Sequence, residues 1–171
     1  MLQQLRSGTA PFETPRNVEL GELAIRVARA KAATGRQVET EIEGGVATLA
    51  HPDRLERVVG HLVQNALEAT SPDETVRVRV YRDGEDCILE VVDAGIGMSP
   101  EFVRDQLFRP FSTTKATGTG IGAYESAQYV TALGGRIHVD SKPGKGTRVQ
   151  MVLRSCVREQ NGGTPGTQAV A

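Results

Sequence analysis

The spacing of apolar residues predicts where this chain forms helices and where it forms strands. Apolar side chains recur every three or four residues over about 21–33 and over about 52–70, which predicts two amphipathic helices. A third helix is expected over about 120–133, and a short one over about 99–107. Alternating or short apolar runs predict about six strands, near 38–42, 46–50, 76–81, 87–93, 136–141 and 147–154.

The order of these elements predicts the fold class. Asp83-Gly84 is typical of a hairpin turn, so the strands around it are expected to run antiparallel. We therefore expect an α/β two-layer sandwich, in which a mixed, mostly antiparallel sheet carries about three helices on one face. Residues 17–155 are expected to form this domain, and the polar, glycine-rich segment 156–171 is expected to be a disordered tail.

Composition narrows the classes of function. The net charge of −1 argues against a broad nucleic-acid-binding surface, which would require a basic excess. No apolar run reaches the roughly 18 residues of a membrane span. The two cysteines, Cys87 and Cys156, are too few for a disulfide framework. We therefore expect a globular domain in the cytoplasm.

The helix expected over 52–70 presents three polar side chains beside its apolar face. His61, Asn65 and Glu68 lie at positions i, i+4 and i+7, so they share one stripe. The carboxamide oxygen of Asn65 is a hard ligand, which Mg²⁺ accepts beside water and phosphate oxygens. Taken alone, the stripe is more simply an ordinary solvated helix face.

Asp93 ends an expected strand and is a candidate for recognition of a base. It has the parity of the apolar residues Leu89 and Val91, which predicts an inward-facing carboxylate that needs a partner. The amino group of adenine is a suitable donor, and Gly95 and Gly97 would let a base approach the backbone closely. The alternative for this segment is a plain turn.

A glycine-rich segment opens the helix expected over 120–133. Free N–H groups and the positive end of the helix dipole favour a phosphate there. The segment is not a Walker A loop, because no Gly-Lys-Ser/Thr follows it, and no strand precedes it as a dinucleotide-binding fingerprint requires. A flexible loop is the alternative. The residues concerned are Gly118, Thr119, Gly120, Ile121 and Gly122.

Two further segments complete the candidate site. The stretch from Phe108 to Lys115 suggests a mobile cover, in which Arg109 or Lys115 meets a terminal phosphate. Thr147, which follows Gly146, would place a hydroxyl near the base. An ordinary surface loop and an ordinary hairpin turn are the alternatives for these two segments.

In this order, the segments resemble the ATP-binding domain of the GHKL superfamily, which includes gyrase, heat-shock chaperones, MutL-type repair proteins and histidine kinases. The resemblance covers about residues 18–153. It is strongest to the sensor histidine kinases, through residues 61–66, 108–111 and 118–122. The stretch 122–130 is similar to the corresponding part of the PrsK-type kinases.

The resemblance implies a Bergerat-type fold that binds Mg-ATP. It implies that Asn65 ligates Mg²⁺, that Asp93 binds the adenine amino group, and that Thr147 reaches adenine through water. It also implies that Gly95 and Gly97 line the base pocket. The phosphates would meet Gly118, Thr119, Gly120, Ile121 and Gly122, with further contacts from Arg109 and Lys115, and the catalytic candidates are His61 and Lys115.

Three features depart from the superfamily pattern. Hydrolytic members carry Glu four residues before the Mg-binding Asn, where this chain has His61, which weakens an assignment as an ATPase or anti-sigma serine kinase. Kinases often place Lys or Arg three residues after that Asn, where this chain has Glu68. None of the histidines lies in the His-Glu or His-Asp context of a phosphoacceptor helix; they are His51, His61 and His138.

We therefore expect the catalytic domain of a longer sensor kinase, which transfers the γ-phosphoryl group of ATP to a histidine on an absent domain. Residues 1–16 would be the end of that histidine-bearing dimerisation hairpin and a linker. A response regulator is the expected downstream partner, and the isolated domain is expected to be a monomer. A parent kinase that is anchored in the membrane would be compatible with a catalytic domain in the cytoplasm. The alternatives are a non-catalytic ATP-dependent switch and a GHKL-type ATPase or serine kinase.

Overall fold

The computed structural model describes residues 14–112 and 120–156 of the chain. Its helices are α1 (Leu20–Ala32), α2 (Pro52–Ala69), α3 (Pro100–Asp105) and α4 (Ile121–Ala132). Its strands are β1 (Arg16–Glu19), β2 (Gln37–Ile42), β3 (Ala47–Ala50), β4 (Thr75–Asp83), β5 (Asp86–Asp93), β6 (Arg136–Lys142) and β7 (Gly146–Arg154). Residues 157–171 of the predicted tail and most of the predicted linker lie outside the described residues. Cys156, the first residue of that tail, is described, and its backbone N–H donates to the Ala47 carbonyl at 3.0 Å.

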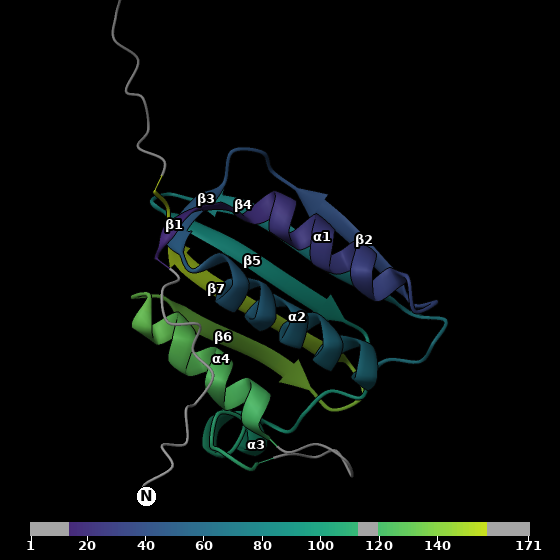
Figure 1. The fold of residues 1–171 in the computed structure, drawn as a ribbon. Coiled ribbons are helices and arrows are strands. Elements are labelled where there is room, and N and C mark those ends of the chain that lie inside the picture. The colour runs from purple at the N-terminus through teal and green to yellow at the C-terminus, as the bar shows by residue number, and fades with distance from the viewer. Residues whose placement is uncertain (1–13, 113–119, 157–171) are drawn as a thin grey trace, which may run out of the picture.

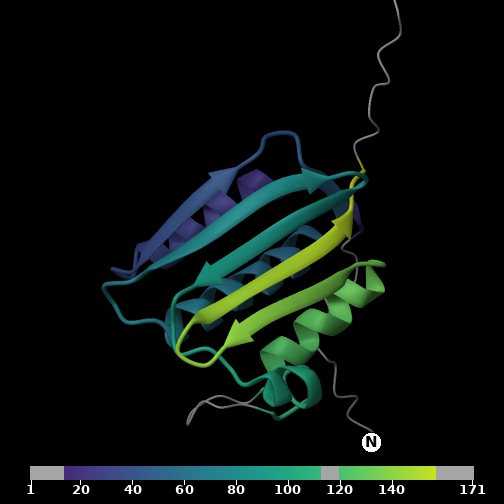
Figure 2. The same cartoon turned by 180° about the vertical axis from the view of Figure 1, so that it is seen from behind.

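The main sheet has five strands in the order β2-β4-β5-β7-β6. Strands β2 and β4 run parallel, and the other neighbouring pairs run antiparallel. Helices α1, α2 and α4 lie side by side over one face of the sheet (Figure 1), and the view from behind shows the opposite face without a covering helix (Figure 2). The predicted α/β two-layer sandwich with a mixed, mostly antiparallel sheet is confirmed.

One part of the topology differs from a simple succession of hairpins. Strands β2 and β3 flank Gly44-Gly45 but do not pair with each other: β2 joins β4, and β3 pairs antiparallel with β1. Strand β1 was not predicted. Its sequence, Arg-Asn-Val-Glu, has one buried apolar residue, Val18, and so carries no alternation that could reveal a strand.

The hydrophobic core lies between the helices and the sheet. Helices α1 and α2 contribute the apolar stripes that their periodicity predicted, α4 contributes Tyr129 and Val130, and the strands contribute alternate residues. A fully buried Leu or Val side chain stabilises the fold by roughly 1.5–3 kcal/mol before entropic costs. The core includes Leu20, Leu23 and Val27 of α1, Leu55, Val59 and Val63 of α2, and Val76, Val78, Leu89, Met151 and Leu153 of the sheet.

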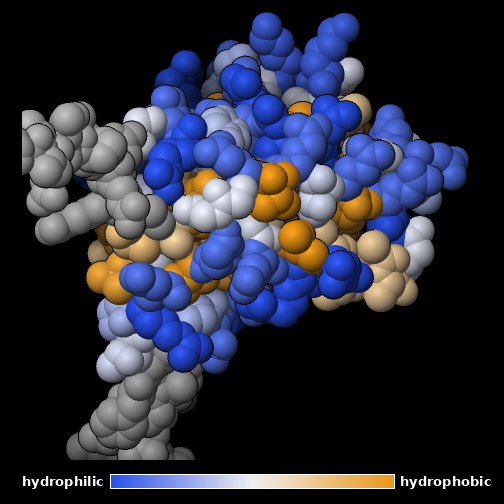
Figure 3. All heavy atoms as spheres, turned by 90° about the horizontal axis from the view of Figure 1, so that it is seen from above, coloured by the Kyte–Doolittle hydropathy of each residue, from blue (hydrophilic) through white to orange (hydrophobic). Residues whose placement is uncertain are grey.

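One face of the molecule is mainly hydrophilic (Figure 3). Seen from above the view of Figure 1, it carries a limited number of apolar residues among polar ones (Figure 3). In the described part of the chain, none of the helices has the length and apolarity needed to cross a membrane.

The start of α2 is fixed by a residue of α4. His51 is the N-cap of α2, but its side chain makes no capping hydrogen bond. Instead, the backbone N–H of His51 donates to the Tyr129 hydroxyl at 2.9 Å, and the Tyr129 side chain is buried. This bond supplies a partner to one of the free N–H groups at the helix start. It also holds α4 alongside α2, which positions the glycine-rich start of α4.

Candidate nucleotide-binding site

Asp93 is the last residue of β5, and 8% of its surface is exposed. It accepts a hydrogen bond from the Gly95 N–H at 2.9 Å. Burial raises the pKa of Asp93 above its ordinary value of 3.8, and hydrogen bonds from the backbone N–H groups of Gly95 and Thr147 oppose that shift. The inward orientation predicted from strand parity is confirmed, and Thr147 is the direct cross-strand neighbour of Asp93.

Three glycines allow the backbone segments around Asp93 to pack closely. A Cβ atom at Gly95 would collide with the Ala69 carbonyl of α2, and one at Gly97 would collide with the Lys142 carbonyl. A Cβ atom at Gly146 would collide with the backbone of Asp93. Because these neighbours are backbone atoms, no side-chain rotation could relieve the collisions. The loop after Asp93 is therefore fitted between the end of α2 and the β6–β7 hairpin.

Helix α2 connects the loop after Asp93 with the start of α4. At one end of the stripe, the Ala69 carbonyl accepts a hydrogen bond from the Ile96 N–H at 3.1 Å. At the other end, the exposed His61 ring lies so close to Gly122 that a Cβ there would be 2.6 Å from the imidazole Nδ1. Asn65 lies halfway and is half-buried. Eight residues of helix separate the two ends, a rise of about 12 Å.

The start of α4 is formed by glycine-rich backbone. Gly120 is its N-cap, with a left-handed φ of 69° and no side-chain capping bond. The backbone of Ser112 packs against Gly120 so tightly that a side chain at 120 would not fit. Ile121 and Gly122 form the first helical turn, as predicted. The N–H groups of that turn form the positive end of the helix dipole, which favours a phosphate there.

Other predicted site residues are placed differently or lie outside the description. Lys115, Gly118 and Thr119 lie outside the described residues. Arg109 is exposed after α3, and its role stays a prediction. Glu68 is exposed, and its Oε1 accepts a hydrogen bond from the Gln64 side chain at 2.9 Å.

The sequence did not single out Ser141, which the structure places beside Thr147 and the loop after Asp93. Its hydroxyl lies 2.7 Å from the Thr147 hydroxyl and accepts from the Met98 N–H at 2.8 Å. Ser141 continues the alternation of Ile137 and Val139 in β6. A polar residue on an apolar parity at the end of a strand was the signal that identified Asp93, and it could also have identified Ser141.

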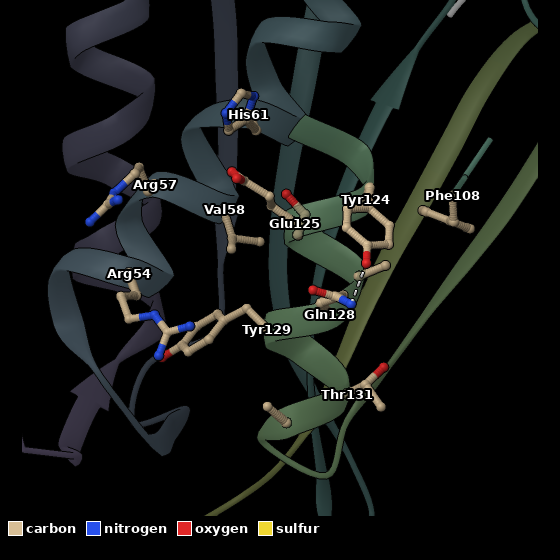
Figure 4. Close-up of a pocket in the computed structure, with 13 residues that line it drawn as sticks. Arg54, Arg57, Val58, His61, Phe108, Tyr124, Glu125, Gln128, Tyr129 and Thr131 are labelled. Carbon is tan, nitrogen blue, oxygen red and sulfur yellow. Dashed lines mark hydrogen bonds between the residues drawn. The ribbon is translucent and has the colours of Figure 1, made fainter. Parts of the chain in front are cut away.

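A groove of about 850 Å³ lies between α2 and α4, next to the candidate site. Figure 4 shows Arg57, Val58 and His61 of α2 on one side of it, and residues of α4 on the other. The guanidinium of Arg54 stacks over the ring of Tyr129, with its Cζ atom 4.4 Å from the ring centroid. Neither Asp93 nor Thr147 lines this groove. The groove therefore extends from His61 and does not include the surroundings of Asp93.

Comparison with known families gives one match to a domain model. The family described as "Histidine kinase-, DNA gyrase B-, and HSP90-like ATPase" matches residues 50–156. The match runs from the residue before His51 to the end of the described chain. It therefore includes α2, the loop after Asp93, α4 and the β6–β7 hairpin.

Curated relatives include several bacterial sensor proteins. The circadian input-output histidine kinase CikA of Synechococcus elongatus is 32% identical over 85% of this chain and 21% of its own length. The C4-dicarboxylate transport sensor protein DctB of Rhizobium meliloti is 37% identical over 73% of this chain and 21% of its own length. The sensor protein kinase FleS of Pseudomonas aeruginosa is 34% identical over 76% of this chain and 32% of its own length. The chain thus spans about a fifth to a third of these relatives.

Solved structures share the fold. The mycobacterial sensor histidine kinase MprB superposes with a TM-score of 0.75 at 24% identity, over 83% of this chain and 98% of the MprB chain. Full-length ShkA in complex with AMPPNP superposes with a TM-score of 0.74 at 21% identity, over 88% of this chain and 34% of the ShkA chain.

Proposed function

Because this chain belongs to the family of histidine kinase-, DNA gyrase B- and HSP90-like ATPases, we propose that it is the Mg-ATP-binding catalytic domain of a sensor histidine kinase. It would transfer the γ-phosphoryl group of ATP to a histidine on another domain of the same protein. The names of the relatives support this reading, since CikA, DctB and FleS are all named as histidine kinases or sensor proteins. We further propose that the parent kinase is of the PrsK type, that a response regulator is its downstream partner, and that the isolated domain is monomeric and cytoplasmic.

The observation that carries the proposal is the stripe along α2. It connects a buried carboxylate beside closely packed glycines with the glycine-rich start of α4, about 12 Å away along the helix axis. This arrangement suits a ligand with a hydrogen-bonding base at one end and anionic groups at the other. ATP has this form, and the family supports ATP as the nucleotide.

Each end of the nucleotide has residues suited to it. Asp93 would accept a hydrogen bond from the adenine amino group, and Gly95 and Gly97 would lie along the base. The backbone N–H groups at Ile121 and Gly122 would bind the phosphates, with Gly118, Thr119 and Gly120 in the segment before them. Thr147 would contact the base through water.

The described residues also fit a magnesium ion that is shared with the phosphates. They contain no group of three or more His, Cys, Asp or Glu side chains that could hold a metal alone. Asn65 lies halfway along the stripe, where its carboxamide oxygen would be one hard ligand among phosphate and water oxygens. A bound Mg²⁺ would neutralise charge on the phosphates during transfer. Asn65 would orient the triphosphate through that ligation.

Positioning of the γ-phosphoryl group and the acceptor histidine would account for most of the rate acceleration. His61 lies against the first turn of α4, so its imidazole would stand near the terminal phosphate. There it would orient the incoming histidine or a water molecule. Lys115 and Arg109 would supply positive charge from the predicted cover. The groove between α2 and α4 begins at His61 and would give the acceptor domain access to that phosphate.

The test is phosphorylation of the intact parent kinase with ATP labelled at the γ-phosphate. The proposal predicts a base-stable, acid-labile phosphohistidine on the parent. The label should be lost in Asn65→Ala and kept in Glu39→Ala, which alters an exposed side chain of the edge strand β2, away from the groove. ATP binding without any histidine label would favour a non-catalytic switch. Steady ATP hydrolysis by this chain alone, lost in Asn65→Ala, would favour an ATPase or serine kinase.

A further inference from the structure

The hydroxyl of Ser141 joins three segments around the proposed base pocket. It accepts a hydrogen bond from the Met98 N–H at 2.8 Å, in the loop after Asp93. It lies 2.7 Å from the Thr147 hydroxyl and 3.1 Å from the Gly146 carbonyl, both in the β6–β7 hairpin. Met98 is 43 residues away in sequence, so this bond is no part of the hairpin itself.

The hydroxyl protons of Ser141 and Thr147 can be arranged in two ways among these hydrogen bonds. A serine hydroxyl has one proton to donate, and the Met98 N–H already occupies one of its lone pairs. In the first arrangement, Ser141 donates to Gly146, and Thr147 donates to Ser141. Thr147 then presents only lone pairs to the pocket. In the second arrangement, Ser141 donates to Thr147, and the Thr147 proton is free for a ligand.

A bound adenine favours the second arrangement. Its amino group would donate to Asp93, which lies at the buried end of the pocket. The ribose and phosphates extend the other way, toward α4, so the edge of the base opposite the ribose faces Asp93. That edge carries N1, an acceptor, directly beside the amino group. Thr147 is the cross-strand neighbour of Asp93, so its hydroxyl is placed to donate toward N1, directly or through one water.

We infer that Ser141 is a positioning residue that fixes the Thr147 hydroxyl as a hydrogen-bond donor to N1 of adenine. This inference rests on the proposed function. The chain of bonds runs from the Met98 N–H through the Ser141 hydroxyl to the Thr147 hydroxyl and then to the base. Hydrogen bonds in such a chain polarise one another, so loss of the middle member weakens the last one. Ser141 itself does not touch the nucleotide.

The test compares ATP with 1-deaza-ATP, in which a C–H group replaces N1. Binding of each to the full 171-residue chain is measured by calorimetry, with 7-deaza-ATP as a control that keeps N1. The wild-type chain should bind 1-deaza-ATP about three- to tenfold more weakly than ATP, the range expected for one hydrogen bond. It should bind 7-deaza-ATP as it binds ATP. Equal affinity of the wild-type chain for ATP and 1-deaza-ATP would overturn the inference without any variant.

Variants then distinguish positioning of the Thr147 hydroxyl by Ser141 from a general contribution of Ser141 to folding stability. Ser141→Ala should bind ATP more weakly and lose most of its preference over 1-deaza-ATP, while Ser141→Thr should keep that preference. Thr48→Val is the matched control, since the Thr48 hydroxyl also bridges two strands by donating to the Arg154 carbonyl at 2.8 Å. It should lower the melting temperature and leave the preference unchanged.

If Ser141→Ala does not fold, Ser141→Cys, which keeps the volume but has a weak hydrogen-bonding group, is measured in the same way. If Ser141→Ala or Ser141→Cys prefers ATP over 1-deaza-ATP as strongly as the wild-type chain does, that result contradicts the role of Ser141. If the wild-type chain binds none of the three nucleotides, the proposed function itself fails, and that result is distinct from equal binding of ATP and 1-deaza-ATP.

Discussion

The imidazole ring of His61 lies directly against the backbone of Gly122. This contact brings the polar stripe of α2 to the first turn of α4, where the proposed phosphate site begins. The other end of the same stripe meets the loop after Asp93 through the Ala69 carbonyl. The two ends of the candidate site are therefore positioned by one helix.

The contact predicts an interaction between substitutions at 61 and 122. Ala in place of Gly within a helix ordinarily stabilises a protein by about 0.5–1 kcal/mol. In Gly122→Ala, however, the new Cβ would lie 2.6 Å from the imidazole unless His61 rotates away. We expect no gain, or a loss, in the wild-type background and a gain in the His61→Ala background. Chemical denaturation measures the free energy of unfolding in all four proteins.

Gly60→Ala is the control for that cycle. Gly60 lies within α2, and a Cβ atom there has no neighbour within 4 Å. It should stabilise both backgrounds equally, by about 0.5–1 kcal/mol. A Gly122→Ala effect that is the same with and without His61 would show that the ring does not press on α4 in solution.

A second prediction concerns the fit of the loop after Asp93. The Cβ atom in Gly95→Ala would overlap the Ala69 carbonyl, and backbone atoms at both sides would have to shift. We expect the free energy of unfolding to fall by about 1–3 kcal/mol, a typical cost of overpacking. ATP binding should weaken as well, since the pocket would be displaced. Gly60→Ala again serves as control, and ATP affinity equal to wild type in Gly95→Ala would contradict the placement of the base.

The carboxyl group of Asp93 predicts how ATP binding depends on pH. Burial raises its pKa above 3.8, so it takes up a proton at a higher pH than an ordinary aspartate. The carboxylate is the form that accepts from the adenine amino group. As pH falls from 7 through the raised pKa, ATP affinity should therefore fall. The ratio of wild-type to Asp93→Asn affinity isolates this effect, because protonation of the nucleotide itself cancels. A ratio that does not change with pH would reject the role of Asp93.

The raised pKa of Asp93 gives the stability of the ligand-free domain the opposite dependence on pH. A raised folded-state pKa means that Asp93 contributes stability that is fully present below 3.8 and is lost as pH rises through the folded value. The free carboxylate is thus a cost that the domain carries at neutral pH, and nucleotide binding offsets it.

The sequence predicted those features that depend on local pattern. Strand parity placed Asp93 inward, and the helical stripe placed Asn65 between His61 and the loop after Asp93. The glycine segment was expected at the start of a helix, and Gly120 is the N-cap of α4.

Features that depend on distant contacts were not predictable in this way. Strand β1 has one buried apolar residue, Val18, and exists because β3 pairs with it. Gly95 was predicted because glycine lets a base approach the backbone, whereas the structure shows that a Cβ atom there would collide with the Ala69 carbonyl of α2. Strand parity could have marked Ser141 as inward-facing, but its hydrogen bond to the Met98 N–H joins two distant segments and could not be read from any local pattern.

Asn65→Ala predicts a selective loss of metal-dependent binding. Its carboxamide would ligate Mg²⁺, and a hydrogen bond or ligand to a charged group contributes about 1.5–3 kcal/mol, so Mg-ATP affinity should fall roughly tenfold or more. Affinity for ATP in the presence of a chelator should change much less. Gln64→Ala is the matched control, because Gln64 lies on the same helix and bonds to Lys31 and Glu68. Equal losses with and without Mg²⁺ would place Asn65 outside the metal site.

The most direct test of the account is a map of amide chemical shifts during titration of the chain with a non-hydrolysable ATP analogue and Mg²⁺. The account predicts changes at Gly95, Gly97 and Thr147 around the base, at the Asn65 side chain, and at Gly122 at the start of α4. No change at millimolar nucleotide, or changes confined to Arg54, Tyr124 and Gln128 in the groove between α2 and α4, would contradict it.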